Sequence, residues 1–141
     1  MVKTSFRHLA QCCKDLNKTR RFYEELLGFT FTEARDSNRE GTAKLLNMSW
    51  PFKLNLVFLQ KDGFELELMD FPLHGTVPGH EWVTNQEGLV FLSLGMAAKD
   101  IPELIAKVPE YGGKVLGNTN LGGAVCIEDP DGAVLEMVGS D

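Results

Sequence analysis

Two glutamates in otherwise apolar segments are the residues of this chain best suited to chemistry. Glu136 stands within the apolar run 133–138, which follows the turn sequence Asp-Pro-Asp-Gly of residues 129–132. Glu67 stands in the similar segment 63–69. Burying a carboxylate without a partner costs roughly several kcal/mol, so each glutamate is either exposed to solvent or held in place for a function. Carboxylates held in this way act as general acids or bases, or bind divalent cations.

The two glutamates belong to segments that resemble one another. Aligning Gly63 with Gly132 places Glu67 on Glu136, 69 residues apart. Such an internal repeat indicates that the chain is built from two modules. Two carboxylates facing one cavity without a metal would repel, and one of them would retain its proton. That arrangement suits metal-free proton transfer as well as metal binding.

The surrounding sequence predicts the elements that position these acids. Apolar periodicity and the N-cap residue Asp15 predict a helix over residues 16–27. A second helix is predicted over 101–108, opened by a capping-box-like Asp100 and Glu103. Strands are predicted over residues 6–13, 42–48, 54–60, 64–70, 89–94, 114–116, 124–128 and 133–138, and a further strand is predicted to start at residues 29–33.

Each module therefore follows the order β-α-β-β-β, which predicts an α+β fold. We expect one domain over residues 1–141, with module one at 4–71, a linker at 72–87 and module two at 88–141. The linker is the part of the chain richest in Pro and Gly between the two repeats.

Composition excludes several classes of protein. The net charge of −6 disfavours nucleic acid as a partner, because phosphate binding requires a basic surface. Since no apolar run approaches the ~18 residues of a membrane span and the N-terminal residues lack the apolar core of a signal peptide, we expect a cytoplasmic protein. The three cysteines form no CxxC motif, so neither a disulfide framework nor a zinc cluster is indicated.

Two segments together resemble the vicinal oxygen chelate (VOC) superfamily. Residues 8–29, from His8-Leu9 to Phe22-Tyr23 and Gly28-Phe29, are similar to the family's opening motif, and residues 128–136 are similar to its closing motif. This family includes glyoxalase I, methylmalonyl-CoA epimerase, extradiol dioxygenases, fosfomycin-resistance enzymes and bleomycin-binding proteins. The chain looks nearest to bacterial glyoxalase I. The resemblance implies that the two modules form a curved, barrel-like sheet with an internal cleft, and that the protein is a homodimer.

The resemblance also implies a set of metal ligands. The family's four ligand positions fall on His8, Glu67, Leu89 and Glu136. Leucine cannot bind a metal, so the chain lacks one ligand. The remaining residues, His8, Glu67 and Glu136, could hold Zn²⁺, Ni²⁺, Mn²⁺, Fe²⁺ or Co²⁺ with positions left open for a substrate. No organic cofactor is predicted. In such a site Glu67 or Glu136 would act as the catalytic base.

Three functions stay open at this level. The first is a metal-dependent isomerase, epimerase or lyase that abstracts a proton next to a carbonyl of a small substrate. The second is a metal-free protein that sequesters a ligand, as bleomycin-resistance proteins do, with the aromatic side chains of Trp50, Phe52 and Trp82 lining a cleft. The third is a metal-independent enzyme in which Glu67 and Glu136 form an acid–base pair.

Overall fold

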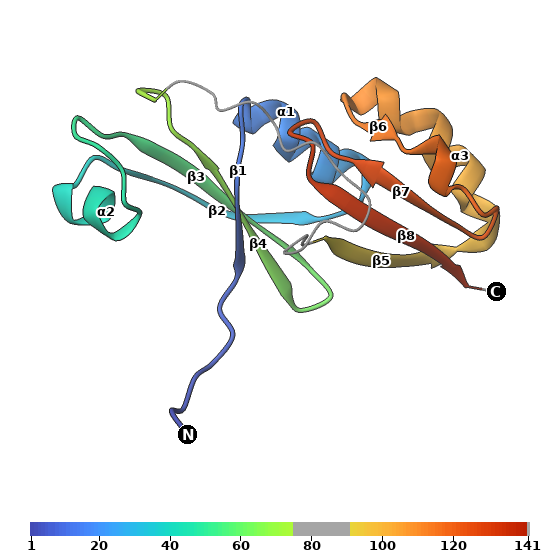
Figure 1. The fold of residues 1–141 in the computed structure, drawn as a ribbon, viewed down its shortest axis with the longest axis horizontal. Coiled ribbons are helices and arrows are strands. Elements are labelled where there is room, and N and C mark those ends of the chain that lie inside the picture. The colour runs from blue at the N-terminus through green and yellow to red at the C-terminus, as the bar shows by residue number, and fades with distance from the viewer. Residues whose placement is uncertain (75–90, 141) are drawn as a thin grey trace. The chain divides into compact units, whose positions relative to one another are not determined.

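The computed structural model describes residues 1–74 and 91–140. The chain divides into a first unit, residues 1–77, and a second unit, residues 78–141. Each unit contains a single four-stranded sheet with helices beside it (Figure 1). The predicted linker over residues 72–87 lies for the most part outside the described residues, as does Leu89.

The sheet of the first unit consists of β1 (Leu9–Cys12), β2 (Thr30–Ser37), β3 (Leu54–Lys61) and β4 (Phe64–Asp70). Its strand order is β1-β4-β3-β2, with β1 parallel to β4 and the other pairs antiparallel. The hairpin between β3 and β4 turns at Asp62 and Gly63, both of which have positive φ angles. This Asp-Gly pair is the expected sequence for a two-residue turn, because both positions require left-handed backbone.

The helix predicted over residues 16–27 is present as α1 (Leu16–Arg21), which continues into the π-helical segment η1 (Phe22–Leu26). The side chain of Asp15 caps it by accepting a hydrogen bond from the Lys18 backbone at 3.0 Å. Gly28 follows the helix with a φ of 70°, as a helix stop requires. Helix α1 lies against β4. The core of this unit includes the fully buried side chains of Phe22 and Tyr23 on η1 and of Leu66 and Leu68 on β4.

The prediction of a strand over residues 42–48 is wrong. The chain forms helix α2 (Glu40–Leu45) instead, beside the end of the β2–β3 hairpin region (Figure 1). Helical spacing brings Ala43 and Leu46 to one side, where both belong to an apolar cluster. The other members of this cluster are Met48, Phe52, Leu54, Leu56, Phe58, Met69 and Phe71. The helix therefore covers one end of the sheet face that also carries Glu67.

The second unit repeats this topology. Its strands are β5 (Leu92–Ala97), β6 (Lys114–Val115), β7 (Ala124–Glu128) and β8 (Val134–Ser140), in the order β5-β8-β7-β6. Again the first strand is parallel to the last. Helical segments η2 (Ala98–Asp100), α3 (Ile101–Lys107) and η3 (Val108–Tyr111) connect β5 to β6, and η4 (Gly117–Thr119) precedes β7. The core consists of buried residues from the helices and strands, including Ile101, Leu104, Val108, Val125, Ile127 and Leu135.

The start of α3 differs from the prediction. Asp100 has helical backbone angles and its side chain makes no capping hydrogen bond, so the expected capping box is absent. The preceding turn η2 already leads the chain into the helix, which leaves Asp100 inside the helical path and not at its boundary. The α+β class and the repeated β-α-β-β-β order are confirmed by both units. The curved sheet with a common cleft stays a prediction.

A buried aspartate organises the turn before β8. Asp129 is 3% exposed, and its Oδ1 accepts hydrogen bonds from the backbone of Asp131 at 2.8 Å and of Ala133 at 2.9 Å. Gly132 completes the turn with a φ of 88°. The Asp-Pro-Asp-Gly sequence therefore fixes the point at which β8, and with it Glu136, begins.

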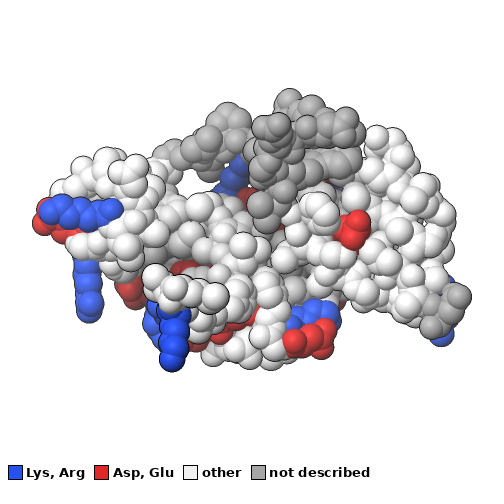
Figure 2. All heavy atoms as spheres, turned by 60° about the horizontal axis from the view of Figure 1, so that its bottom comes forward, with Lys and Arg blue, Asp and Glu red and all other residues white. Residues whose placement is uncertain are grey.

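Charged side chains of both signs are interspersed on the molecular face drawn in Figure 2. Among the described residues, acidic and basic side chains also form ion pairs one helical turn apart, such as Arg21 with Glu25 at 2.9 Å and Lys107 with Glu103 at 2.6 Å. Within the described residues, no helix is long and apolar enough to cross a membrane.

Candidate active site

The acids of β4 leave the strand on one face of the sheet. Leu66 and Leu68 are fully buried against the helical side. Because side chains alternate along a strand, Glu65 and Glu67 must lie on the opposite face. Glu67 is itself only 8% exposed, which makes it one of the few buried charged residues in the described part of the chain. A carboxylate buried to this extent requires a partner.

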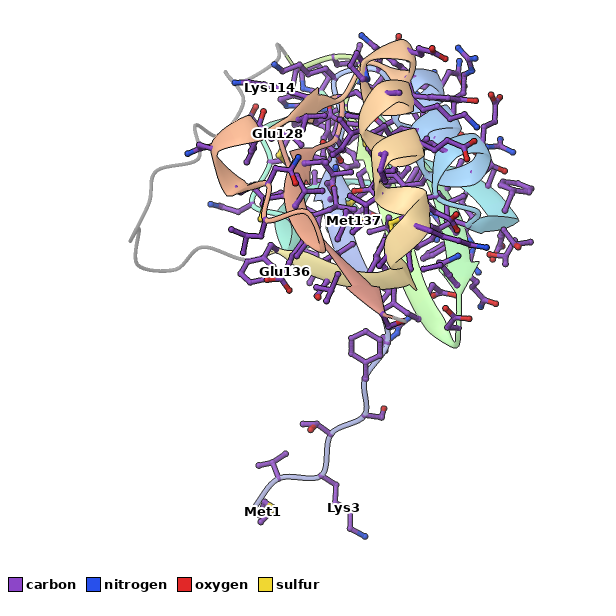
Figure 3. The ribbon with its side chains drawn as sticks, turned by 90° about the vertical axis from the view of Figure 1, so that its right-hand side faces the viewer. Met1, Lys3, Lys114, Glu128, Glu136 and Met137 are labelled. Carbon is purple, nitrogen blue, oxygen red and sulfur yellow. The ribbon has the colours of Figure 1, made fainter. Side chains whose placement is uncertain are left out.

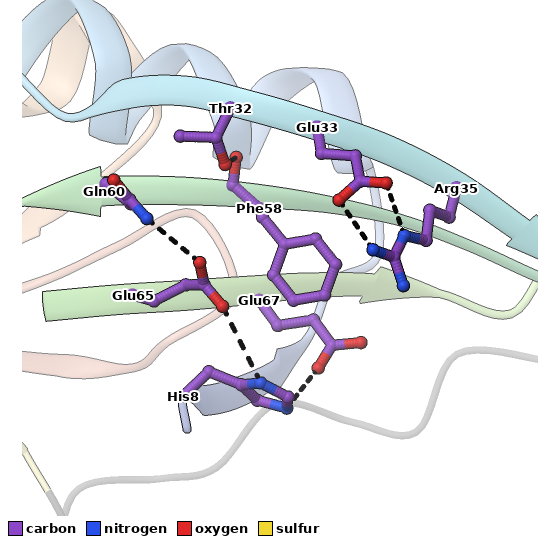
Figure 4. Close-up of polar contacts among 8 residues, drawn as sticks. All are labelled: His8, Thr32, Glu33, Arg35, Phe58, Gln60, Glu65 and Glu67. Carbon is purple, nitrogen blue, oxygen red and sulfur yellow. Dashed lines mark hydrogen bonds and ion pairs between the residues drawn. The ribbon is translucent and has the colours of Figure 1, made fainter. Parts of the chain in front are cut away.

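His8 supplies that partner. It lies one residue before β1, and the parallel pairing of β1 with β4 places Ala10 opposite Glu67. His8 Nε2 lies 2.6 Å from Glu67 Oε2, within hydrogen-bond distance (Figure 4). The His8 side chain is 24% exposed, so it covers the carboxylate and remains accessible to a small molecule. The structure thus brings together two of the three predicted site residues.

A second carboxylate approaches His8 from its other ring nitrogen. Glu65 Oε1 lies 3.9 Å from His8 Nδ1, and Gln60 Nε2 donates a hydrogen bond to Glu65 Oε2 at 3.1 Å. Figure 4 shows these side chains in a continuous row from Gln60 through Glu65 and His8 to Glu67. The sequence indicates Glu65 by its alternation with Glu67, but gives no signal for Gln60, which joins the row only through the β3–β4 register.

Phe58 lies between this row and an ion pair on β2. The His8 ring meets Phe58 edge-on with centroids 5.6 Å apart, and the Arg35 guanidinium lies 5.6 Å from the same ring centroid. Arg35 donates two hydrogen bonds to Glu33, at 2.6 and 2.8 Å. These bonds lower the pKa of Glu33. The same bonds raise the pKa of Arg35, and the negative charges of Glu65 and Glu67 raise it further. Arg35 is therefore engaged with acidic partners.

Glu136 occupies the equivalent position in the second unit. It lies on β8 between Ser93 of β5 and Cys126 of β7, its partners in the two strand pairings. Ser93 Oγ donates a hydrogen bond to Glu136 Oε1 at 2.8 Å. In Figure 3 Glu136 and Met137 leave β8 on different sides, as alternation requires, and Met137 is buried. Ser93 has no counterpart among the residues singled out from the sequence.

The strand registers also define which residue of the second unit corresponds to His8. Leu9 pairs with Leu66, and Leu92 pairs with Leu135, 69 residues further along than Leu66. The residue before Leu92 is Phe91, which therefore takes the place of His8 and is 47% exposed. By this register the missing fourth ligand position falls on Phe91, whereas the sequence alignment placed it on Leu89. In both cases an apolar side chain stands where an imidazole would be needed.

The donor atoms in the first unit are of the types that bind divalent cations, but they lie in direct contact with one another. Two donors bound to one Zn²⁺ at about 2.1 Å in tetrahedral geometry lie about 3.4 Å apart, so the 2.6 Å between His8 Nε2 and Glu67 Oε2 is a hydrogen-bonded contact that a cation would have to open. An imidazole nitrogen with a carboxylate oxygen suits Zn²⁺ and the other cations predicted above. Within residues 1–74 and 91–140, no group of three or more His, Cys, Asp or Glu side chains is arranged to hold a metal ion. The participation of Glu136 in one site with His8 and Glu67 stays a prediction.

The aromatic residues suggested for a ligand cleft differ in their surroundings. Phe52 is 2% exposed and belongs to the apolar cluster beside α2. Trp50 is 60% exposed. Trp82 lies outside the described residues. Phe52 thus contributes to the core of the first unit, which is the ordinary role of a buried phenylalanine.

Solved structures with the same fold span nearly the whole chain. A glyoxalase family protein from Bacillus cereus is 15% identical with a TM-score of 0.79, covering 99% of this chain and 97% of its own. The fosfomycin resistance protein FosX from Listeria monocytogenes is 14% identical with a TM-score of 0.63, covering 99% and 95%. The trypanothione-dependent glyoxalase I of Leishmania major is 22% identical with a TM-score of 0.62, covering 96% and 87%.

At these identities the structural likeness shows the fold alone. No curated protein matches the chain. A family model, however, matches residues 5–137, which include the predicted opening and closing motifs and both glutamates. The family expected from those motifs is thereby confirmed: the chain belongs to the Glyoxalase/Bleomycin resistance protein/Dioxygenase superfamily.

Proposed function

We propose that this protein is a glyoxalase-like enzyme that abstracts a proton next to a carbonyl group of a small substrate, in an isomerase, epimerase or lyase reaction. His8, Glu67 and Glu136 would hold a divalent cation, which when bound supplies an electrophile that stabilises negative charge on substrate oxygen atoms. The observation that carries the proposal is the 2.6 Å contact between His8 Nε2 and the buried carboxylate of Glu67.

Glu67 and Glu136 are the acid–base residues of this proposal. The Glu67 carboxylate accepts the proton from the substrate carbon, while His8 fixes its orientation through the contact with Oε2. One carboxylate oxygen of Glu136 accepts a hydrogen bond from Ser93, and the other oxygen would exchange a proton with the substrate. The burial of Glu67 supports this role, since a carboxylate shielded from water is held in one orientation by its partner.

Family members support the cation as well. The FosX relative from Listeria monocytogenes is known in a complex with Mn(II) and sulfate ion. In our proposal the present chain uses a related cation with three of the family's four ligand positions, because Leu89 by sequence, or Phe91 by strand register, replaces a histidine.

The metal content of the purified protein tests the proposal directly. The protein is purified without a histidine tag, and its metals are measured by inductively coupled plasma mass spectrometry. We expect near-stoichiometric metal in the wild type and its loss in His8→Ala and Glu136→Ala. His74→Ala is the matched control, because His74 contacts Ser49 at 3.2 Å and is not proposed as a ligand. Screening of α-hydroxycarbonyl and thioester substrates follows.

A wild-type protein without metal, and without uptake of added Zn²⁺, Ni²⁺, Mn²⁺, Fe²⁺ or Co²⁺, would contradict this proposal. The same His8–Glu67 contact then favours a second candidate, a metal-independent enzyme in which Glu67 and His8 exchange the substrate proton. That enzyme would keep its activity in the presence of a chelator and lose it in Glu67→Gln.

A further inference from the structure

Strand β2 forms the outer edge of the sheet in the first unit. In the order β1-β4-β3-β2 it pairs with β3 alone among the described strands, and its residues 30–36 are exposed. We propose that this edge pairs in antiparallel fashion with β2 of a second copy of the chain, about a two-fold axis at Ala34. The inference goes beyond the proposed function and does not depend on it, because it concerns a surface that needs no bound cation.

The backbone of β2 is suited to such pairing. An edge strand presents N–H and C=O groups that are spaced for hydrogen bonds with another strand, and a long exposed edge is a site of association. β2 has eight residues, whereas the other edge strands of the two described sheets, β1, β5 and β6, have four, six and two. A bulge lies between Phe31 and Glu33, and residues 33–37 pair regularly with β3. β2 is therefore the longest edge strand in the described part of the chain.

The charges of β2 complement those of the same strand running in the opposite direction. In an antiparallel pair, residues directly opposite one another lie on the same face, and opposite charges at such positions stabilise the pair. With the axis at Ala34, Glu33 of each copy lies opposite Arg35 of the other. Both side chains are exposed, at 46% for Glu33 and 61% for Arg35.

The guanidinium group of Arg35 can bind two carboxylates at once. It donates two hydrogen bonds to Glu33 of its own chain, at 2.6 and 2.8 Å. A guanidinium has about five N–H donors, so these bonds do not exhaust it. The two glutamates and two arginines of the pair would therefore form a closed square in which acidic and basic groups alternate.

The same charges disfavour the neighbouring registers. A two-fold axis perpendicular to the sheet keeps equivalent side chains of both copies on one face, so the axis must pass beside a residue and not between two residues. An axis at Glu33 would place two carboxylates opposite each other, and an axis at Arg35 would place two guanidinium groups opposite each other. Like charges in these positions destabilise a strand pair. Ala34 is thus the central axis position at which the charges attract.

The proposed interface adjoins the candidate active site. Arg35 lies 5.6 Å from the centroid of the Phe58 ring, which meets His8 edge-on. Glu33 pairs with Phe58, and Phe58 pairs with Glu67, so these side chains share one face of the sheet (Figure 4). Pairing about the axis would therefore bring the Glu67 faces of both copies to the same side of a continuous sheet, with four strands from each copy.

The mass of the protein in solution tests whether a dimer forms. Few residues of each copy pair, so we expect a weak dimer whose population depends on protein concentration. Sedimentation equilibrium measures the mean mass over about 1 to 500 µM protein. The mass should rise toward that of two chains. The dissociation constant should increase with salt, because exposed ion pairs are screened.

Charge reversal tests the register. Glu33→Arg and Arg35→Glu each place like charges opposite one another, twice in each dimer, and each should weaken the dimer at least about tenfold. The double variant E33R/R35E restores the alternation with the signs exchanged and should dimerise like the wild type. An equimolar mixture of the two single variants should form a mixed dimer, because one copy then carries two basic and the other two acidic side chains.

Glu103→Arg is the matched control for charge reversal. It breaks an exposed ion pair of the same kind, with Lys107 on α3, and should leave the association unchanged. Circular dichroism checks that every variant is folded. Recovery of the dimer in the double variant and in the mixture separates an effect on the interface from a defect in folding.

A cysteine cross-link gives an independent readout of the axis. In the proposed dimer the Cβ atoms of the two Ala34 residues lie about 5 Å apart, so Ala34→Cys should be cross-linked under oxidising conditions. Asp36→Cys is the positional control, because the two Asp36 residues would lie four residues apart along the strand, about 13 Å. The wild type, with its own three cysteines, gives the background.

Each outcome is independent of the metal content of the protein. A wild type that remains monomeric over the whole concentration range overturns the inference. A dimer that neither charge reversal weakens uses another surface and overturns it as well. The inference also fails if the mixture of single variants does not associate, or if Ala34→Cys is cross-linked no better than Asp36→Cys. All of these results leave the proposed function intact.

Discussion

In the first unit Glu67 lies between Ala10 and Phe58 and contacts His8, whereas in the second unit Glu136 lies between Ser93 and Cys126 and accepts a hydrogen bond from Ser93. The strand order and the parallel first pair are the same in both units. Topology thus determines where the acid stands. The side chains on the neighbouring strands determine its partner, and only the first unit offers an imidazole at this place within the described residues.

The largest effects on folding stability are expected at buried positions that are equivalent in the two units. Leu66 and Leu135 are equivalent, fully buried leucines on β4 and β8. Replacing either by Ala should lower the free energy of unfolding by about 2–5 kcal/mol, through lost apolar burial and the cavity left behind. Urea denaturation followed by circular dichroism measures both variants. If one of the two variants unfolded with nearly the wild-type free energy, the two leucines would not be equivalent in the packing of their cores.

The turns that precede the two acids should respond differently to mutation. Asp129→Ala removes the buried acceptor of two backbone N–H groups and should cost about 1–3 kcal/mol of unfolding free energy. Asp129→Asn keeps an acceptor oxygen and should cost less. Asp62→Asn in the β3–β4 turn is the counterpart, with an expected change within about 0.5 kcal/mol, because Asp62 is exposed. Thermal unfolding measures the stability of the three variants. An equal loss of stability in the Asp129 and Asp62 variants would contradict the expected difference between the two turns.

The missing imidazole of the second unit can be restored. If the strand register identifies the right position, Phe91→His should raise the affinity for Zn²⁺ by about tenfold, equivalent to about 1.4 kcal/mol. Leu89→His, the position given by sequence alignment, should raise it less. Chelator competition measures both affinities. A larger gain from Leu89→His would show that the alignment, and not the register, identifies the ligand position.

The smallest effect concerns Glu33, whose carboxylate on β2 has no counterpart on the two-residue strand β6. Its pKa lies below the ordinary value of 4.5 because Arg35 hydrogen-bonds the ionised form. The pair therefore stabilises the fold above pH 4.5, and this contribution is lost as the pH falls through the lowered pKa. An NMR titration of Glu33 should show the lowered value in the wild type and a return toward 4.5 in Arg35→Met. An unchanged value in Arg35→Met would contradict this assignment.

The repeat of Glu67 and Glu136 made the two-unit fold predictable, because an acid at a fixed distance after a turn glycine marks the same strand twice. The segment 42–48 was not predictable in this way. Its apolar residues are too few to distinguish a strand from a helix, and Ala43 and Leu46 were placed only by packing onto Phe52 and Leu56.

The sequence predicts those site residues that stand in a recognisable motif or repeat. His8 and Glu67 came from motifs, and the structure brings them together. Gln60 and Ser93 could not have been found, because each reaches its carboxylate through a strand pairing. Gln60 meets Glu65 across the β3–β4 hairpin, and Ser93 meets Glu136 from β5, which is distant in the sequence. A hydroxyl or amide on a strand has no sequence pattern that distinguishes it from an ordinary exposed residue.

The parallel pairing of β1 with β4 has a consequence for the order in which the protein folds. His8 and Glu67 are 59 residues apart, and their contact closes a loop that contains the helices and the other two strands of the first unit. The entropy lost in closing so long a loop favours early formation of the β3–β4 hairpin and late docking of β1. The contact between His8 and Glu67 would then be among the last to form, and the first to be lost when the native state opens locally.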